Sequence, residues 1–209
     1  MRLEEIKDFC IRQGFRPKKD QAGKLAEYMN MLHRWNRRMN LVGPKTPRDI
    51  LEGLIADSLY LSSFFRELSL PEDPLSLDLG AGAGLPGIPL RTFWTPGTYY
   101  LIEIRQKRVF FLRHVLRTLE LPRTHVLWKR VEDLDPGTAD IVISRAFMPL
   151  QKLLPLAANL LGRKGRIVLM SGEDLDKAPS GWEIEAAVDY SAGGRTRYLF
   201  SLLPNSCSS

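Results

Sequence analysis

The chain has 209 residues, of which 44% are hydrophobic and 26% are charged. The 30 lysine and arginine residues exceed the 24 aspartate and glutamate residues, so the formal net charge is +6. This composition is ordinary for a globular protein and excludes collagen-like, low-complexity and wholly disordered chains. A chain of this length buries roughly 70% of its surface on folding, which is enough for one full core and a small appendage.

The amino terminus and the cysteines bear on where the protein is expected to work. Residues 1–5 carry acid where a signal peptide needs basic residues followed by an apolar run. No apolar stretch approaches the roughly 18 residues that a membrane span requires. Cys10 and Cys207 match neither a metal-ligand spacing nor a disulfide framework. We therefore expect a cytoplasmic protein with no membrane association and no bound metal.

Residues 1–70 are predicted to form a small helical appendage. Apolar residues recur at steps of three and four over residues 3–14, 25–40 and 47–59, which is typical of amphipathic helices. The first helix is expected to end at Gly14 and the second before a Gly-Pro pair. A linker-like stretch with two prolines follows residue 70, and the character of the chain changes after it.

Residues 71–209 are predicted to form an α/β domain. Short β-rich runs alternate with helical ones, at residues 75–79, 99–103, 126–131, 140–144 and 165–170. Two further runs, 182–190 and 197–203, flank Gly193-Gly194, which favours an antiparallel hairpin. Alternating strands and helices require right-handed crossovers and parallel pairing. The expected fold is therefore Rossmann-like α/β, with a seven-stranded, mostly parallel sheet that ends in an antiparallel hairpin.

A glycine-rich loop follows the first predicted strand and precedes a short helix. Glycines let the backbone turn tightly and approach a ligand without clashes from a Cβ atom. The dinucleotide fingerprint G-x-G-x-x-G is matched by Gly82, Gly84 and Gly87. The D-x-G-x-G-x-G loop of S-adenosylmethionine enzymes is matched by Asp78, Gly80, Gly82 and Gly84. No G-x-x-x-x-G-K-[ST] motif is present, which disfavours a P-loop nucleotidase.

Acidic residues after the next two predicted strands support a nucleoside ligand. Glu103 ends the second strand, 23 residues after Gly80, where a carboxylate can accept both ribose hydroxyls. Val131 and Glu132 lie at the end of the third strand, where backbone donors near Val131 and the carboxylate of Glu132 could contact adenine. The alternative for each acid is an ordinary solvated side chain, but together the three strand ends favour cofactor binding.

The rest of the chain favours S-adenosylmethionine over a nicotinamide dinucleotide. A dehydrogenase of this type needs a further substrate domain or a proton donor, yet none of His33, His114 and His125 follows the carboxyl end of a predicted strand. A domain of this size that closes with a hairpin has the outline of a minimal methyltransferase. A nicotinamide-dependent oxidoreductase is the alternative.

Positive charge is concentrated in three windows that contain no Asp or Glu: residues 28–48, 104–119 and 141–172. If they converge in space, they form the electrostatic footprint of a polyanion-binding protein. Otherwise they are separate solubilising faces. We expect the first window to cover the cofactor cleft and the third to bracket it. If the partner is a nucleic acid, the candidate contacts are Arg34, Arg37, Arg38, Lys107, Arg108 and Phe147.

Several motifs resemble the family of ribosomal RNA small subunit methyltransferase G, also called glucose-inhibited division protein B. The most specific are the glycine loop with its extension Gly-Leu-Pro-Gly-Ile-Pro-Leu at residues 84–90 and the tetrapeptide Ser-Arg-Ala-Phe at residues 144–147. Further matching segments are Trp35-Asn36, Asn40-Leu41, Asp57-Ser58-Leu59, Lys107-Arg108-Val109, Phe111-Leu112-Arg113 and Arg130-Val131-Glu132.

This resemblance implies a class I S-adenosylmethionine-dependent methyltransferase fold and methyl transfer to N7 of one guanosine in 16S ribosomal RNA. The implied partner is 16S RNA or the small ribosomal subunit, and we expect the protein to act as a monomer. Another S-adenosylmethionine-dependent RNA methyltransferase with a different target is an alternative. The resemblance places five residues at the cofactor: Gly80, Leu85, Val131, Glu132 and Arg145.

Guanine N7 carries an exposed lone pair and no proton, so its attack on a sulfonium methyl group needs no general base. Catalysis can then depend on positioning and on stabilisation of charge. Arg145 is the predicted positioning residue, since it could bind the cofactor carboxylate or hold the guanine. Phe147 is predicted to stack on the target base, with packing in the core as the alternative.

The chain also departs from the family pattern at three places. Gly53-Leu54 stands where Arg-His is usual before the Asp-Ser pair, and Met170-Ser171-Gly172 stands where Leu-Lys-Gly is usual. Glu103 replaces the commoner aspartate, which preserves a carboxylate. The first two departures remove basic residues that a standard member would have available for RNA.

Overall fold

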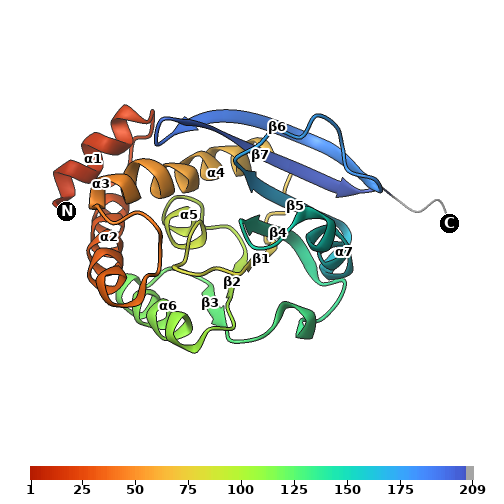
Figure 1. The fold of residues 1–209 in the computed structure, drawn as a ribbon, viewed down its shortest axis with the longest axis horizontal. Coiled ribbons are helices and arrows are strands. Elements are labelled where there is room, and N and C mark those ends of the chain that lie inside the picture. Colours follow the sequence, from red (N-terminus) through yellow and green to blue (C-terminus); the bar gives the residue numbers. More distant parts are fainter. Residues whose placement is uncertain (206–209) are drawn as a thin grey trace.

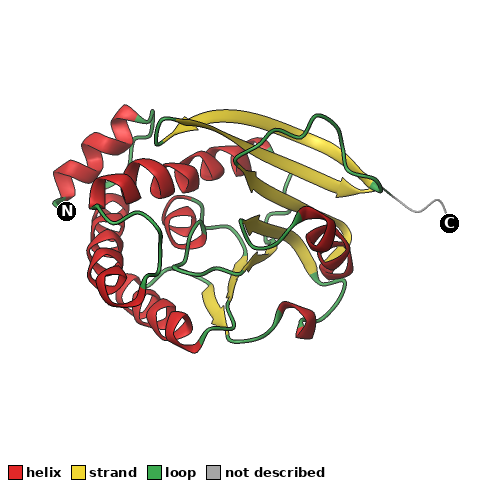
Figure 2. Cartoon of the chain, viewed as in Figure 1, coloured by secondary structure: helices red, strands yellow, loops and turns green. Residues whose placement is uncertain are grey.

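Seven strands form one sheet, flanked on both sides by helices in the computed structural model, which describes residues 1–205 (Figures 1 and 2). Cys207 lies outside the described residues. The strands are β1 (Leu75–Leu79), β2 (Thr98–Ile102), β3 (Thr124–Leu127), β4 (Ala139–Arg145), β5 (Leu161–Ser171), β6 (Trp182–Ala192) and β7 (Arg195–Pro204). Their order in the sheet is β3-β2-β1-β4-β5-β7-β6. The first five are parallel, whereas β7 pairs antiparallel with both β5 and β6, so the predicted sheet is confirmed.

The helical elements are α1 (Leu3–Arg12), α2 (Lys19–Met39), α3 (Pro47–Ile50), the π-helical turn η1 (Leu51–Ile55), α4 (Ala56–Glu67), α5 (Gly87–Phe93), α6 (Gln106–Leu119), the 3-10 turn η2 (Val131–Asp133) and α7 (Leu150–Leu160). The three predicted amino-terminal helices are confirmed. The third differs in detail, because α3, η1 and α4 follow one another directly and include a π turn. None of the helices in residues 1–205 combines the length and the apolar character needed to cross a bilayer.

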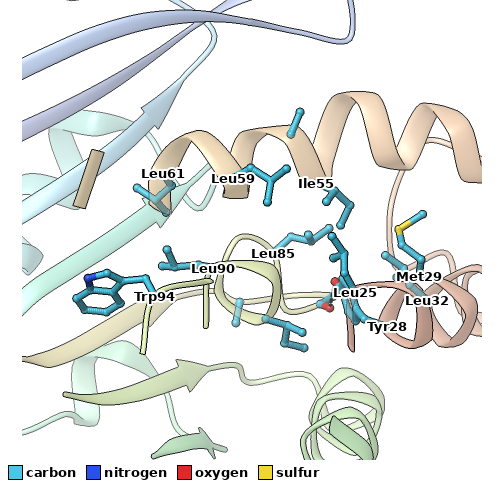
Figure 3. Close-up of a cluster of buried hydrophobic side chains, with 14 of the residues drawn as sticks. Leu25, Tyr28, Met29, Leu32, Ile55, Leu59, Leu61, Leu85, Leu90 and Trp94 are labelled. Atoms are coloured by element: carbon cyan, nitrogen blue, oxygen red, sulfur yellow. Dashed lines mark hydrogen bonds between the residues drawn. The ribbon is translucent and has the colours of Figure 1, made fainter. Parts of the chain in front are cut away.

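Side chains alternate between the two faces of the sheet, as a strand period of two requires. On one face, residues such as Tyr99 and Ile143 belong to a buried cluster that includes side chains of α1, α2, α4, α5 and α6. On the other, residues such as Leu77 and Val142 pack against α7. Figure 3 shows how α2 and α4 close over α5 and the glycine loop in the larger cluster. Residues 1–70 thus share a core with the sheet, and their separation as a domain stays a prediction.

The structure bears on two local predictions, the hairpin at Gly193-Gly194 and the strand over residues 126–131. Gly193 and Gly194 have φ angles of 59° and 72°, the left-handed conformation that tight hairpin turns need, so the predicted hairpin is confirmed. The strand predicted over residues 126–131 is wrong in its second half, because β3 ends at Leu127. β3 is the edge strand of the sheet, and residues 128–130, which follow it, are exposed. Extending the strand over these residues would bury no further apolar surface.

A fully buried arginine, Arg91 of α5, fixes the loop that leads into β2. Its guanidinium donates to the carbonyl oxygens of Trp94, Thr95, Pro96, Gly97 and Pro122 and to the hydroxyl of Thr124, at 2.6–3.3 Å. Its Cζ also lies 5.6 Å from the centre of the Tyr99 ring. Burial lowers the pKa of Arg91 to about 10, so the group stays charged at neutral pH.

We predict that Arg91→Ala lowers the free energy of unfolding by about 3 kcal/mol or more, because several buried carbonyl groups lose their donors at once. Urea unfolding followed by circular dichroism measures the change. Arg66→Ala is the matched control, since Arg66 donates to the carbonyl of Phe93 at 2.9 Å but is exposed. It should shift stability by about 0.5 kcal/mol at most. Equal losses in the two variants would contradict this account.

Candidate functional site

The order of strands creates a crevice at the carboxyl edge of the sheet. The chain passes from β1 outward through β2 and β3, then returns to pair β4 with the other side of β1. In open α/β sheets, ligands bind beyond the carboxyl ends of the strands where the order reverses in this way. Here that point lies between β1 and β4, between the loops that follow these two strands.

The loop after β1 depends on its glycines for its backbone conformation and for its close packing. Gly80, Gly82 and Gly84 have φ angles of 69°, 60° and 85°, a conformation that other residues rarely adopt. A Cβ atom on Gly84 would lie 2.2 Å from Cδ1 of Ile88, and one on Gly87 would lie 2.5 Å from Cδ2 of Leu101. The glycines therefore let the loop pack closely on α5 and on the sheet, as the sequence predicts. Leu85 in the same loop is buried.

Asp78 lies behind this loop in β1. Its carboxylate accepts a hydrogen bond from the Tyr99 hydroxyl at 3.1 Å, and a Cβ atom on Gly87 would lie 2.6 Å from its Oδ2. Burial raises the pKa of Asp78 to about 7, although the bond from Tyr99 opposes the rise. Asp78 is thus enclosed between the strand and the start of α5, where it supports the loop. Its direct contact with a cofactor stays a prediction.

Glu103 follows β2 and is held by backbone donors. Its Oε1 accepts from the amides of Ile104 and Arg105 at 2.9 and 2.8 Å, and its Oε2 accepts from the amide of Gly82 at 3.0 Å. The guanidinium of Arg108 lies 3.6 Å from the same Oε2. The side chain of Glu103 is only 4% exposed. This carboxylate is therefore fixed in orientation beside the glycine loop, as an acceptor for hydroxyl donors needs to be.

A cavity of about 110 Å³ opens beside Glu103. It is lined by Gly80, Ile102, Glu103, Ile104, Lys129, Arg130, Val131, Glu132 and Phe147. Ile104 is a large side chain that remains 55% exposed at this place, so it offers an apolar surface to a ligand. Sequence reasoning missed Ile104, although its position directly after the strand-end acid could have indicated it.

Phe147 forms a further wall of this cavity. A Cβ atom on Gly80 would lie 2.3 Å from Cδ2 of Phe147, so the ring covers the glycine backbone directly. Its neighbours Ala146 and Met148 line a second cavity of about 270 Å³ at the carboxyl ends of β4 and β5. The segment after β4 thus separates two hollows at the edge of the sheet. Phe147 is partly buried here, and its stacking on a target base stays a prediction.

Arg145, at the end of β4, is tied to two distant segments. Its Nη1 lies 3.3 Å from Oδ2 of Asp57 in α4, and Oδ1 of Asp57 accepts from the Tyr190 hydroxyl of β6 at 3.0 Å. Burial raises the pKa of Asp57, and the charge of Arg145 opposes this rise. The network orients the guanidinium at the carboxyl edge of the sheet. The pairing could not be read from the sequence, and the cofactor contact of Arg145 stays a prediction.

The first two basic windows converge. Trp35 of α2 packs on Phe111 of α6 with ring centres 5.4 Å apart, which brings the two helices together at the lower left of Figure 1. Trp35, near the end of α2, faces the middle of α6 there, since its ring also lies near Phe110 and His114. Of the predicted RNA contacts, Arg34, Arg37, Arg38 and Lys107 are exposed, whereas Arg108 is partly buried against Glu103.

The prediction that the third window brackets the cofactor cleft is wrong for most of its length. Arg163 and Lys164 lie near the start of β5, at the opposite edge of the sheet from Arg145. Arg166 is engaged by Glu185, with Nη1 2.6 Å from Oε1. The physical reason is the length of β5. Its first residues lie at the amino ends of the parallel strands, and only its last residues lie at the carboxyl ends, beside Arg145.

Comparison with solved structures bears on the fold. A SAM-dependent methyltransferase from Aquifex aeolicus superposes with a TM-score of 0.54 at 18% identity, over 74% of this chain and 92% of that chain. The P. horikoshii TYW2 structure in complex with MeSAdo superposes with a TM-score of 0.53 at 14% identity, over 71% and 61% of the two chains. The fold is therefore that of S-adenosylmethionine-dependent methyltransferases, as predicted.

Curated relatives are similar over almost the whole chain. Ribosomal RNA small subunit methyltransferase G of Nitratidesulfovibrio vulgaris (strain DP4) is 43% identical over 204 residues, which cover 96% of this chain and 94% of that protein. The protein of the same name from Lawsonia intracellularis shows the same identity and coverage. The one from Shigella flexneri is 32% identical over 80% of this chain and 81% of its own length. The model of the family described as rRNA small subunit methyltransferase G matches residues 21–191, and this chain therefore belongs to that family.

Proposed function

We propose that this protein transfers a methyl group from S-adenosylmethionine to N7 of a guanine in 16S ribosomal RNA. The observation that carries the proposal is the buried carboxylate of Glu103, held by three backbone amides beside the glycine loop and facing a cavity with apolar walls. Membership of the family supports the choice of reaction and substrate. The reaction would take place in the cytoplasm, with a single protein molecule acting on the RNA or on the small subunit.

The residues around the cavity fit an adenosine group. Glu103 would accept the ribose hydroxyls, while Ile104 and Val131 would flank the planar base. Glu132, exposed at the rim, would accept a hydrogen bond from the amino group of the base. At Gly82, where a Cβ atom would meet nothing closer than 3.5 Å, the loop leaves room for the remainder of the cofactor. The cofactor supplies an electrophilic methyl group on a positively charged sulfur.

Methyl transfer to N7 places few chemical demands on the protein. The lone pair of guanine N7 lies in the plane of the base and carries no proton, so attack requires alignment but no base. Consistent with this, none of the three histidines in residues 1–205 lines the cavity beside Glu103. Arg145 would hold the guanine or the cofactor carboxylate in line, because Asp57 and Tyr190 fix the direction of its guanidinium.

The proposal is tested with purified protein, tritiated S-adenosylmethionine and 16S RNA that lacks the modification, both free and within small subunits. We expect tritium in the RNA, and mass spectrometry of nuclease fragments should identify N7-methylguanosine at one position. No cofactor binding and no labelling at millimolar S-adenosylmethionine would overturn the proposal. If the methyl group is found on another base or another atom, the methyltransferase activity is supported and the proposed target, guanine N7, is wrong.

We predict that Glu103→Gln weakens S-adenosylmethionine binding at least about tenfold, because hydrogen bonds to a charged acceptor are roughly twice as strong as those to a neutral one. Isothermal titration calorimetry measures the dissociation constant, and circular dichroism verifies that the variant is folded. Glu72→Gln is the control, since this glutamate is exposed in the loop before β1. Unchanged affinity in folded Glu103→Gln would remove the ribose role of this carboxylate.

We also predict that Tyr190→Phe lowers kcat about three- to tenfold with a change of less than about twofold in the KM for RNA. The lost hydrogen bond to a charged group leaves Asp57, and through it Arg145, less well oriented. Steady-state kinetics with subsaturating and saturating RNA separates the two constants.

Tyr60→Phe is a matched control for Tyr190→Phe. The two rings stack with centres 4.5 Å apart, but the Tyr60 hydroxyl donates to the side chain of Gln13 at 3.3 Å and does not bind Asp57. This variant should keep the parent kcat. If both variants lose activity equally, the packing of the hairpin matters and the bond to Asp57 does not.

A further inference from the structure

One large side chain stands out on the surface formed by α2 and α6. Phe110 is 66% exposed, the highest value among the large hydrophobic side chains of residues 1–205. Its ring centre lies 6.0 Å from that of Trp35, which is itself only partly buried. His114 lies 5.8 Å from Trp35 on the same side. An aromatic group left in water gains none of the free energy of burial.

Basic side chains surround these rings. Lys107 and Arg113 lie one turn before and after Phe110 on α6, and Arg38 lies one turn after Trp35 on α2. All three are exposed, and none forms an ion pair with a carboxylate in the described part of the chain. Because residues 28–48 and 104–119 contain no acid, the surface attracts an anion over its whole extent.

Both helices of this surface contact the glycine loop or Glu103. The Tyr28 hydroxyl of α2 donates to the carbonyl of Ala83 in the glycine loop at 2.9 Å. At the start of α6, Arg108 lies 3.6 Å from the carboxylate of Glu103. A chain-like ligand bound along the surface would therefore lead directly to the cavity beside Glu103.

We propose that Phe110 is a stacking platform for an unpaired base of the RNA substrate, with Lys107, Arg113 and Arg38 binding the adjacent phosphates. The proposal deepens the methyltransferase function and rests on it for the identity of the polymer. An exposed aromatic ring among cations suits single-stranded nucleic acid, since every base has a face that stacks and every nucleotide carries a negative charge. Two copies of this surface would repel each other, which argues against a second copy of the chain as the occupant.

The test compares binding of a single-stranded oligoribonucleotide and of a blunt duplex of the same sequence, followed by fluorescence anisotropy. Phe110→Ala should weaken single-strand binding about five- to a hundredfold, with less than about twofold change for the duplex. Phe110→Trp should restore the affinity. Ile11→Ala is the control, because Ile11 is 59% exposed on α1 and has no place in this surface.

Salt dependence separates stacking from charge. Phe110→Ala should leave the slope of log affinity against log salt unchanged, whereas Lys107→Ala should reduce its magnitude by about one. Single-strand affinity within twofold of the parent in Phe110→Ala would overturn the platform. So would equal losses for duplex and single strand, or a parent protein that is a dimer and becomes a monomer in this variant.

Methylation and cofactor binding by the parent protein distinguish failure of this proposal from failure of the proposed function. If the parent methylates 16S RNA but Phe110→Ala keeps the parent KM for RNA, the platform is wrong and the function stands. The other outcome is a parent that neither binds S-adenosylmethionine nor transfers methyl groups, while Phe110→Ala still weakens single-strand binding. In that case the proposed function is wrong and the surface remains an RNA-binding one. Where the parent binds S-adenosylmethionine, Phe110→Ala should bind it with the same affinity.

Discussion

The buried carboxylate of Asp57 joins three parts of the chain that lie far apart in sequence. A charge at this depth costs several kcal/mol unless it is paired, so the fold is complete only when Arg145 and Tyr190 both reach it. This carboxylate therefore links the amino-terminal helices, the parallel sheet and the hairpin. The same contacts direct the guanidinium of Arg145 toward the carboxyl edge of the sheet, so stability and the geometry of the site have a common origin.

A second set of contacts holds the glycine loop against β1 and β2. Arg91 fixes the loop before β2 and lies against Tyr99, whose hydroxyl bonds to Asp78 behind the loop. In front, the carboxylate of Glu103 accepts from Gly82. The loop is thus held from both sides by the protein's own groups, and a cofactor would meet an acceptor that is already oriented. Such preorganisation reduces the entropy lost on binding.

The glycine loop and the Asp57 network differ in how far the sequence predicts them. The glycine loop, the strand-end acid and the Gly193-Gly194 hairpin follow from local patterns, and the structure agrees with them. The pairing of Asp57 with Arg145 joins positions 88 residues apart and leaves no local pattern. The exposure of Ile104 and the reach of β5 across the sheet also depend on neighbours distant in sequence. Contacts set by tertiary packing are therefore the part that sequence reasoning misses.

The departure from the family at Gly53 has an electrostatic consequence. A Cβ atom on Gly193 would lie 3.2 Å from the Cα of Gly53, yet a Cβ atom on Gly53 itself meets nothing within 4 Å, so packing does not require glycine there. Nothing in the structure explains the missing arginine. The nearby Arg48 is paired with Glu52 at 2.8 Å. Attraction of phosphate fades beyond a Debye length of about 8 Å. We therefore expect RNA to approach the methyl donor from the α2–α6 side, where Arg38, Lys107 and Arg113 form no ion pair within residues 1–205.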